Sequence, residues 1–233
     1  MNRWKPSTSS HRAIAKPSRR QWVVPSLLLL LAALPALGGV YRVLHLSFGG
    51  EVTAANQRFF DSPIAITLHG ISCALFAFLG AFQFNTGPRR KPKRHRIRGA
   101  LFMPSALVVA ITGLWMEAFQ ELPAHDGDLL SLFRVVFSVG MIACTLLGIR
   151  ALLRRKFAQH GAWMMRTYAI GMGAGTQVVV FILWGLFMGP TSLTERAYLM
   201  GASWAINVIF VEWILIRKNR RTTISLKTVK PIS

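Results

Sequence analysis

The sequence predicts an all-α fold, a polytopic bundle of about six transmembrane helices. Three observations lead to this prediction: 52% of the 233 residues are hydrophobic, long apolar runs recur along the whole chain, and the basic residues gather between these runs. A membrane-spanning helix needs about 20 mostly apolar residues to cross about 30 Å of hydrocarbon. Each long run is therefore expected to be one span.

Six apolar windows of that length define the expected spans and the domain organisation. The windows are residues 22–43, 63–84, 99–119, 129–153, 163–188 and 198–216. We expect one transmembrane helical domain, residues 22–218, between a basic cytoplasmic N-terminal segment, residues 1–21, and a basic cytoplasmic tail, residues 219–233. The connecting loops are too short to form a further domain.

The first window also fits a cleavable signal peptide. A charged stretch, the apolar run "SLLLLLAALPAL" and the small residues "ALGG" have the order of such a signal. The apolar run continues past the small residues into "VYRVL", which favours an uncleaved membrane anchor. Cleavage would leave five spans in the same orientation, so both alternatives share one topology.

The charged residues predict the orientation of the spans. The chain has 28 Lys and Arg residues and 8 Asp and Glu residues. With the N-terminus in the cytoplasm, the basic residues lie on the cytoplasmic side with four exceptions, which are Arg42, Arg58, Arg134 and Arg196. All acidic residues except Glu212 lie on the opposite side. This positive-inside bias predicts a bacterial inner-membrane protein with both termini in the cytoplasm.

The same bias accounts for the net charge of +20 without a nucleic-acid partner. Since no nucleic-acid-binding motif occurs, we expect the lipid bilayer as partner, together with a membrane-complex partner or a second copy of the chain. Cys73 and Cys144 lie inside expected spans and are too few for a metal site. No nucleotide loop, Ser-His-Asp arrangement or HExxH motif occurs, so no enzyme class is indicated.

Small residues predict which spans form the core. Gly171 and Gly175 lie four positions apart in the fifth window, and windows two to four carry small or hydroxyl residues along one helical face. Small residues let membrane helices approach closely, because lipid leaves no hydrophobic driving force between them. We therefore expect a core of two helical hairpins, spans two to five, with spans one and six outside it. His95 and His160, 65 residues apart, mark equivalent places in the two hairpins.

Three ionisable residues lie at membrane depth near the outer ends of their spans: His69, Glu117 and Arg134. Charged groups are costly there and are functional candidates for that reason. We expect the three side chains to share an outer pocket that could relay protons, hold an anionic headgroup or orient a haem propionate. The alternative is structural: Glu117 and Arg134 reach the rim, and His69 hydrogen-bonds a neighbouring helix.

A second group of polar residues lies at the cytoplasmic ends of the spans. Its members, the inner rim, are Gln83, His95, Arg98, His160, Arg166 and Glu212. Glu212 is the only acidic residue on this side, so we expect an ion pair with Arg166 or Arg98. The alternative is that the basic residues only anchor helix ends against anionic lipid.

Four stretches carry a resemblance to a known family: "LHGISCALFAFLGAFQF", "HRIRGALF", "QHGAWMMRTYAIGMGAGTQ" and "SWAINVIFVEWILIRK". Together they resemble the bacterial integral-membrane family catalogued as domain of unknown function 2306, over roughly residues 63–218. The resemblance implies a polytopic bacterial membrane protein and no particular activity. The recurring polar positions that it implies are His69, Gln83, His95, Gly99, Arg134, His160, Trp163, Met164, Arg166, Tyr168 and Glu212.

The leading functional prediction is a non-catalytic accessory or scaffold membrane protein, because no catalytic motif occurs. The first alternative is a small proton-coupled transporter that uses the outer pocket and polar residues deeper in the bundle. Transporters often contain broken helices near the membrane midplane. Only Pro104 and the stretch "GMGAG" indicate such a break here.

The second alternative is an electron carrier that binds b-type haem. Two axial histidines must lie at one depth on different helices, and His95 with His160 satisfies this requirement. Near the outer side, His69 could pair with His45 or His125. Haem is the one cofactor that the residues bring into consideration.

Overall fold

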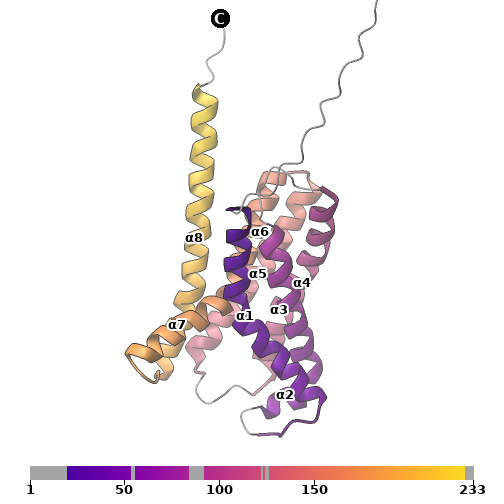
Figure 1. Ribbon diagram of the computed structural model, residues 1–233, viewed down its shortest axis with the longest axis vertical. Coiled ribbons are helices and arrows are strands. Elements are labelled where there is room, and N and C mark those ends of the chain that lie inside the picture. The colour runs from indigo at the N-terminus through magenta and orange to yellow at the C-terminus, as the bar shows by residue number, and fades with distance from the viewer. Residues whose placement is uncertain (1–19, 54–55, 84–91, 122, 124–125, 229–233) are drawn as a thin grey trace, which may run out of the picture.

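The computed structural model describes residues 20–53, 56–83, 92–121, 123 and 126–228. Within these residues every regular element is an α-helix, and the helices form an elongated bundle (Figure 1). The helices are α1 Arg20–Ser47, α2 Gln57–Asp61, α3 Pro63–Gln83, α4 Pro92–Phe119, α5 Asp128–Leu153, α6 Phe157–Gly171, α7 Gly173–Phe187 and α8 Leu193–Thr228.

The six predicted spans are confirmed. Among the described residues, α1, α3, α4, α5, the pair of α6 and α7, and α8 are long and apolar enough to cross a membrane. Several helices extend beyond the apolar windows, and the longest extensions are those of α4, which begins at Pro92, and of α8, which ends at Thr228. Lys and Arg are good helix formers, so the basic flanks continue the helices instead of ending them.

The core lies mainly between the two predicted hairpins, α3 with α4 and α5 with α6, and α1 adds Ala32 to it. α4 packs on α5, and the Tyr168 hydroxyl of α6 donates a hydrogen bond of 3.0 Å to the Ala77 carbonyl of α3. In the centre, the Phe76 and Phe102 rings stack with their centroids 4.9 Å apart, beside the Tyr168 ring. Gly80 makes this packing close, because a Cβ atom there would collide with the Tyr168 ring.

The fifth span is broken into two helices. α6 ends at Gly171, Met172 has φ −73° and ψ −4°, and α7 begins at Gly173. α6 stays in the core, whereas α7 packs against α1 and α8 and runs beside the start of α8 (Figure 1). Residues 157–187 still form one candidate span, and the interruption lies in the stretch "GMGAG" that indicated a break. The glycines at the break allow the close approach that redirects α7, since Gly175 faces the Leu31 backbone of α1.

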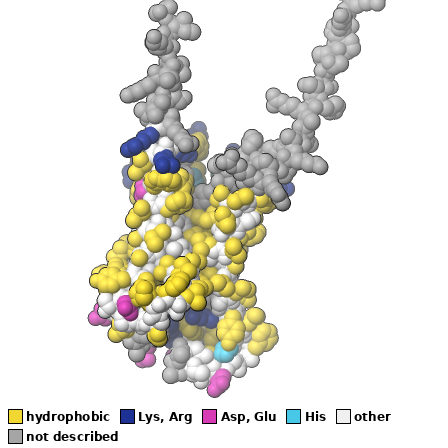
Figure 2. Space-filling model, turned by 60° about the vertical axis from the view of Figure 1, so that its left-hand side comes forward, with side chains coloured by type: hydrophobic (Ala, Val, Ile, Leu, Met, Phe, Trp, Pro, Cys, Tyr) yellow, Lys and Arg dark blue, Asp and Glu magenta, His cyan; other side chains and the backbone are white. Residues whose placement is uncertain are grey.

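Charge divides the described bundle into two ends. We name the end with the start of α4, residues 154–156 and the last turns of α8 the basic end. The opposite end, with α2 and the starts of α5 and α8, is the acidic end. Figure 2 shows Lys and Arg side chains gathered at the top and Asp and Glu side chains near the bottom. α1 begins and α8 ends at the basic end (Figure 1).

The contact of α7 with α1 gives a stability prediction. We expect Gly175→Ala to lower the free energy of unfolding by about 1–3 kcal/mol, the usual cost of overpacking. The new Cβ atom would overlap the Leu31 carbonyl, which is backbone and cannot rotate away. Thermal unfolding in detergent measures the effect. Gly185→Ala on the same helix is the control, because its Cβ atom meets nothing within 4 Å. Equal melting temperatures for the two variants would contradict this packing.

Candidate functional site

Four arginines from four different helices meet at the acidic end. Arg42 lies on α1, Arg58 on α2, Arg134 on α5 and Arg196 on α8. These are the four basic residues that the sequence places away from the basic end. We call them the arginine cluster. A buried charge is expensive unless it is paired, so a guanidinium that the fold buries needs a partner.

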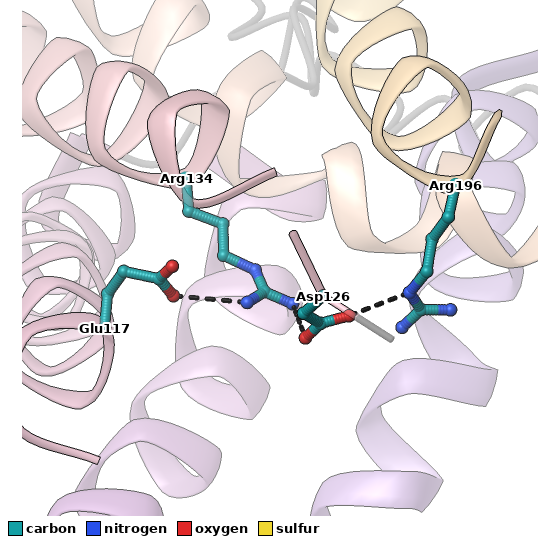
Figure 3. A network of polar contacts seen from close by, with 4 residues as sticks. All are labelled: Glu117, Asp126, Arg134 and Arg196. Atoms are coloured by element: carbon teal, nitrogen blue, oxygen red, sulfur yellow. Dashed lines mark hydrogen bonds and ion pairs between the residues drawn. The ribbon is translucent and has the colours of Figure 1, made fainter. Parts of the chain in front are cut away.

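An ion-pair network provides partners for two members of the cluster (Figure 3). Arg134 donates to Glu117 Oε2 at 3.2 Å and to Asp126 Oδ2 at 2.7 Å. Arg196 donates through Nε to Asp126 Oδ1 at 2.8 Å. The Asp126 side chain is 2% exposed, so both carboxylate oxygens are buried between guanidinium groups. The network joins α4, α5 and α8 through a residue that lies just before α5.

The two arginines determine the charge state of Asp126. Burial alone would raise the pKa of this carboxyl group, because it disfavours the ionised form. Hydrogen bonds and charge from Arg134 and Arg196 outweigh burial and lower the pKa below its usual value. Asp126 is therefore a carboxylate at neutral pH, and it serves as an ionic link between helices.

Arg42 and Arg58 have no such link among the described residues. Their guanidinium carbons lie 4.6 and 4.7 Å from the centroid of the Phe59 ring, in cation–π contact. Arg58 Nε is buried without a hydrogen-bond partner, and so is Glu117 Oε1. Burial lowers the pKa of Arg58, and the charge of Asp126 opposes this effect. Within the described part of the chain, these two guanidinium groups thus have no carboxylate partner.

Two adjoining cavities lie beside the arginine cluster. The polar cavity, of about 270 Å³, is lined by Arg42, Arg58, Glu117 and Arg134 together with apolar residues. The apolar cavity, of about 760 Å³, lies between α1, α3 and α7, and its lining is mostly apolar. The residues that line both are Arg42, Ile66, His69 and Met200. An anion with an apolar part could therefore contact both cavities at once.

The structure brings together the three residues of the predicted outer pocket. His69, Glu117 and Arg134 all line the polar cavity. His69 is not part of the ion-pair network: its Nδ1 atom lies 2.9 Å from Thr112 Oγ1 on α4. The sequence prediction missed Arg42, Arg58, Asp126 and Arg196. The sequence did contain a signal for the arginines, because the four members of the arginine cluster are the only Lys or Arg residues on the predicted outer side.

At the basic end, Glu212 on α8 pairs with Arg166 on α6. Arg166 donates through Nε at 2.5 Å and through Nη2 at 2.9 Å, and it also lies over the Trp163 ring. This is the first of the two partners expected for Glu212. The second, Arg98, instead donates a long hydrogen bond of 3.5 Å to the Phe82 carbonyl. The Arg166 pair ties α8 to the core by a bidentate contact.

Each inner-rim histidine bonds to the neighbouring helix of its own hairpin. The Gln83 amide on α3 donates to the His95 carbonyl on α4 at 3.3 Å and lies 3.5 Å from His95 Nε2. His160 Nδ1 on α6 lies 2.9 Å from the Gly148 carbonyl on α5. Neither the polar nor the apolar cavity is lined by these histidines. The pairing of His95 with His160 around a haem stays a prediction.

The outer histidine pairs also remain predictions. The His45 ring on α1 lies against Tyr41 and Phe60, with centroids 5.6 and 5.9 Å away. His45 lines a separate small cavity with Arg42, whereas His69 lines the polar and apolar cavities. His125 lies outside the described residues.

Comparison with known protein families gives a match over most of the chain. A family model described as predicted membrane protein, DUF2306, matches residues 66–215. The match covers more than half of the chain and agrees with the resemblance seen in the sequence over roughly residues 63–218. No curated protein and no solved structure matches the chain.

The pKa of Asp126 predicts how stability depends on pH. A carboxyl group whose pKa is lower in the folded state contributes stability above its unfolded pKa, about 3.9. That contribution is lost as the pH falls through the lower, folded value. We expect Asp126→Asn to unfold about 2 kcal/mol more easily at pH 7, because two charge-assisted hydrogen bonds are weakened.

The difference from wild type should narrow as the pH falls below about 4. Thermal unfolding in detergent between pH 7 and pH 3 measures this dependence. Asp128→Asn is the matched control, since Asp128 is exposed in the first turn of α5. A constant difference over the whole pH range would contradict the ionic role of Asp126.

Proposed function

The chain belongs to the DUF2306 family of predicted membrane proteins, and we propose that it is a non-catalytic accessory membrane protein that holds an anionic ligand at its acidic end. One observation carries this proposal. Four arginines surround two connected cavities, and only the carboxylates of Glu117 and Asp126 contact them as ion pairs among the described residues. The site therefore has an excess of two positive charges.

The excess positive charge lies at the acidic end, where most of the other charged side chains are acidic. Other acidic residues of this end, such as Asp61, Glu121 and Asp128, are exposed and line neither cavity. A buried guanidinium without a carboxylate partner is costly, and a bound anion would compensate it. Guanidinium groups present a planar fork of N–H donors that fits carboxylate and phosphate groups. The chemistry of the cluster thus favours an oxyanion.

The carboxylates of the site support binding over catalysis. Asp126 accepts hydrogen bonds from two arginines, and its lowered pKa keeps it ionised. A general acid needs a pKa near the working pH, which this environment opposes. Glu117 is likewise engaged by Arg134. We therefore propose no bond-making step at this site.

For localisation, we propose the bacterial inner membrane with the basic end in the cytoplasm. The positive-inside rule supports this orientation. The arginine cluster then faces the outer leaflet, and its ligand would come from that side. As an accessory protein, the chain is proposed to work with a membrane partner or a second copy.

A proton-coupled transporter is the second candidate function, because the fifth span is broken. The break at Met172 borders the apolar cavity, which Gly171, Met172 and Gly175 help to line. Broken helices beside a midplane site are typical of secondary transporters. Proteoliposomes separate the two functions: the accessory protein binds the anion without moving it, whereas a transporter accumulates it when a pH gradient is imposed.

The role of the unpaired arginines gives the main functional prediction. We expect wild-type protein extracted from membranes in digitonin to retain a small anionic molecule, visible by native mass spectrometry. In the double variant Arg42→Gln and Arg58→Gln, occupancy should fall at least tenfold, because a lost hydrogen bond to a charged group costs about 1.5–3 kcal/mol.

The matched control removes the same charge elsewhere. Arg94→Gln combined with Arg96→Gln neutralises two exposed arginines of α4 at the basic end. This variant should keep wild-type occupancy. The proposal would be overturned if wild type and both double variants retained the same molecules in the same amounts.

A further inference from the structure

We propose that the anionic ligand is an alkyl phosphate monoester, with its phosphate among the arginines and one alkyl chain in the apolar cavity. This inference rests on the proposed function, because it names the ligand class of the same site. It adds two requirements, a doubly charged headgroup and a chain. The charge of the cluster supports the first, and the position of the apolar cavity supports the second.

The headgroup is argued from charge. The excess of two positive charges matches a phosphate monoester, which carries about −1.5 to −2 at neutral pH. A carboxylate would leave one guanidinium without compensation. Arg42 and Arg58 are not paired with carboxylates among the described residues, and Arg58 Nε is a buried donor without an acceptor. Arg196 bonds Asp126 through Nε, and its guanidinium carbon lies 5.5 Å from the centroid of the Phe181 ring.

The position of the apolar cavity supports a chain attached to that headgroup. Arg42 and Arg196 line it at the acidic end, and Ala32, Phe76 and Met172 line it deeper in the bundle. Ala32 and Arg42 are ten residues apart on α1, which corresponds to about 15 Å along a helix. That length is about half the hydrocarbon thickness of a bilayer. The cavity therefore has the reach of a lipid chain in one leaflet.

The cavity is also open to the bilayer. Three residues line the cavity and are exposed: Gly38 on α1, and Ala174 and Ile182 on α7. All three belong to membrane-spanning segments, so the exposed side faces lipid. An amphiphile can enter laterally from the leaflet and place its headgroup among the arginines. A free inorganic anion would occupy only the polar cavity and would leave the larger apolar space without an occupant.

The experiment is equilibrium binding of radiolabelled dodecyl phosphate to the full-length protein in digitonin. We expect saturable binding of one molecule per chain. A hundredfold excess of inorganic phosphate should not displace it, since the chain is missing. Dodecanol should not displace it, since the charge is missing. Dodecanoate should displace it only at a concentration at least tenfold higher than unlabelled dodecyl phosphate, because one charge remains uncompensated.

Two variants test the two parts of the ligand. Arg42→Gln combined with Arg58→Gln should weaken dodecyl phosphate binding at least tenfold, through the loss of two headgroup donors. Gly38→Leu should weaken it by narrowing the apolar cavity, and the change is compatible with folding because a Cβ atom at Gly38 meets nothing within 4 Å. Gly185→Leu, equally open and outside both cavities, is its control and should bind normally.

The outcomes separate this inference from the proposed function. If inorganic phosphate binds as tightly as dodecyl phosphate and the arginine double variant loses both, the anion site stands and the alkyl chain is refuted. If dodecanoate displaces the label as well as dodecyl phosphate does, the phosphate headgroup is refuted. If neither dodecyl phosphate nor inorganic phosphate binds to wild-type protein that thermal unfolding shows to be folded, both proposals fail.

Discussion

The Asp126 carboxylate, buried between Arg134 and Arg196, is the interaction on which the acidic end of the molecule depends. It lies in the connection before α5 and bonds to α5 on one side and to α8 on the other. Through Arg134 the same network reaches Glu117 on α4. Because buried charges need partners, the network ties the start of α8 to α4 and α5. α7 in turn packs on α8 and on α1.

The break at Met172 lies beside the apolar cavity, close to the helices that the network connects. After the break, α7 packs on α1 and α8, and it lines the apolar cavity together with α1 and α3. Glycines permit both the break and the close contacts around it, including Gly175 against the Leu31 carbonyl. The apolar cavity therefore lies directly beside the unpaired Arg42. A helix break and an ion-pair network, distant in sequence, together create one amphipathic site.

Much of the bundle could be predicted from the sequence, because apolar length and charge act locally along the chain. The depth of each residue follows from its place in a span, so Glu212 with Arg166 and the grouping of His69, Glu117 and Arg134 were within reach. Depth does not say which helices are neighbours around the bundle, and Asp126 with Arg196 was missed for that reason. The break was equally hard to predict, since "GMGAG" fits both a close helix contact and an interruption.

A crystal structure with bound 12-bromododecyl phosphate would test the account most directly, because anomalous scattering locates the end of the chain. The account predicts phosphate density between Arg42, Arg58 and Arg196, and a bromine peak inside the apolar cavity near Met172. A bromine peak in the lipid layer outside the helices, with no phosphate density at the arginines, would contradict it.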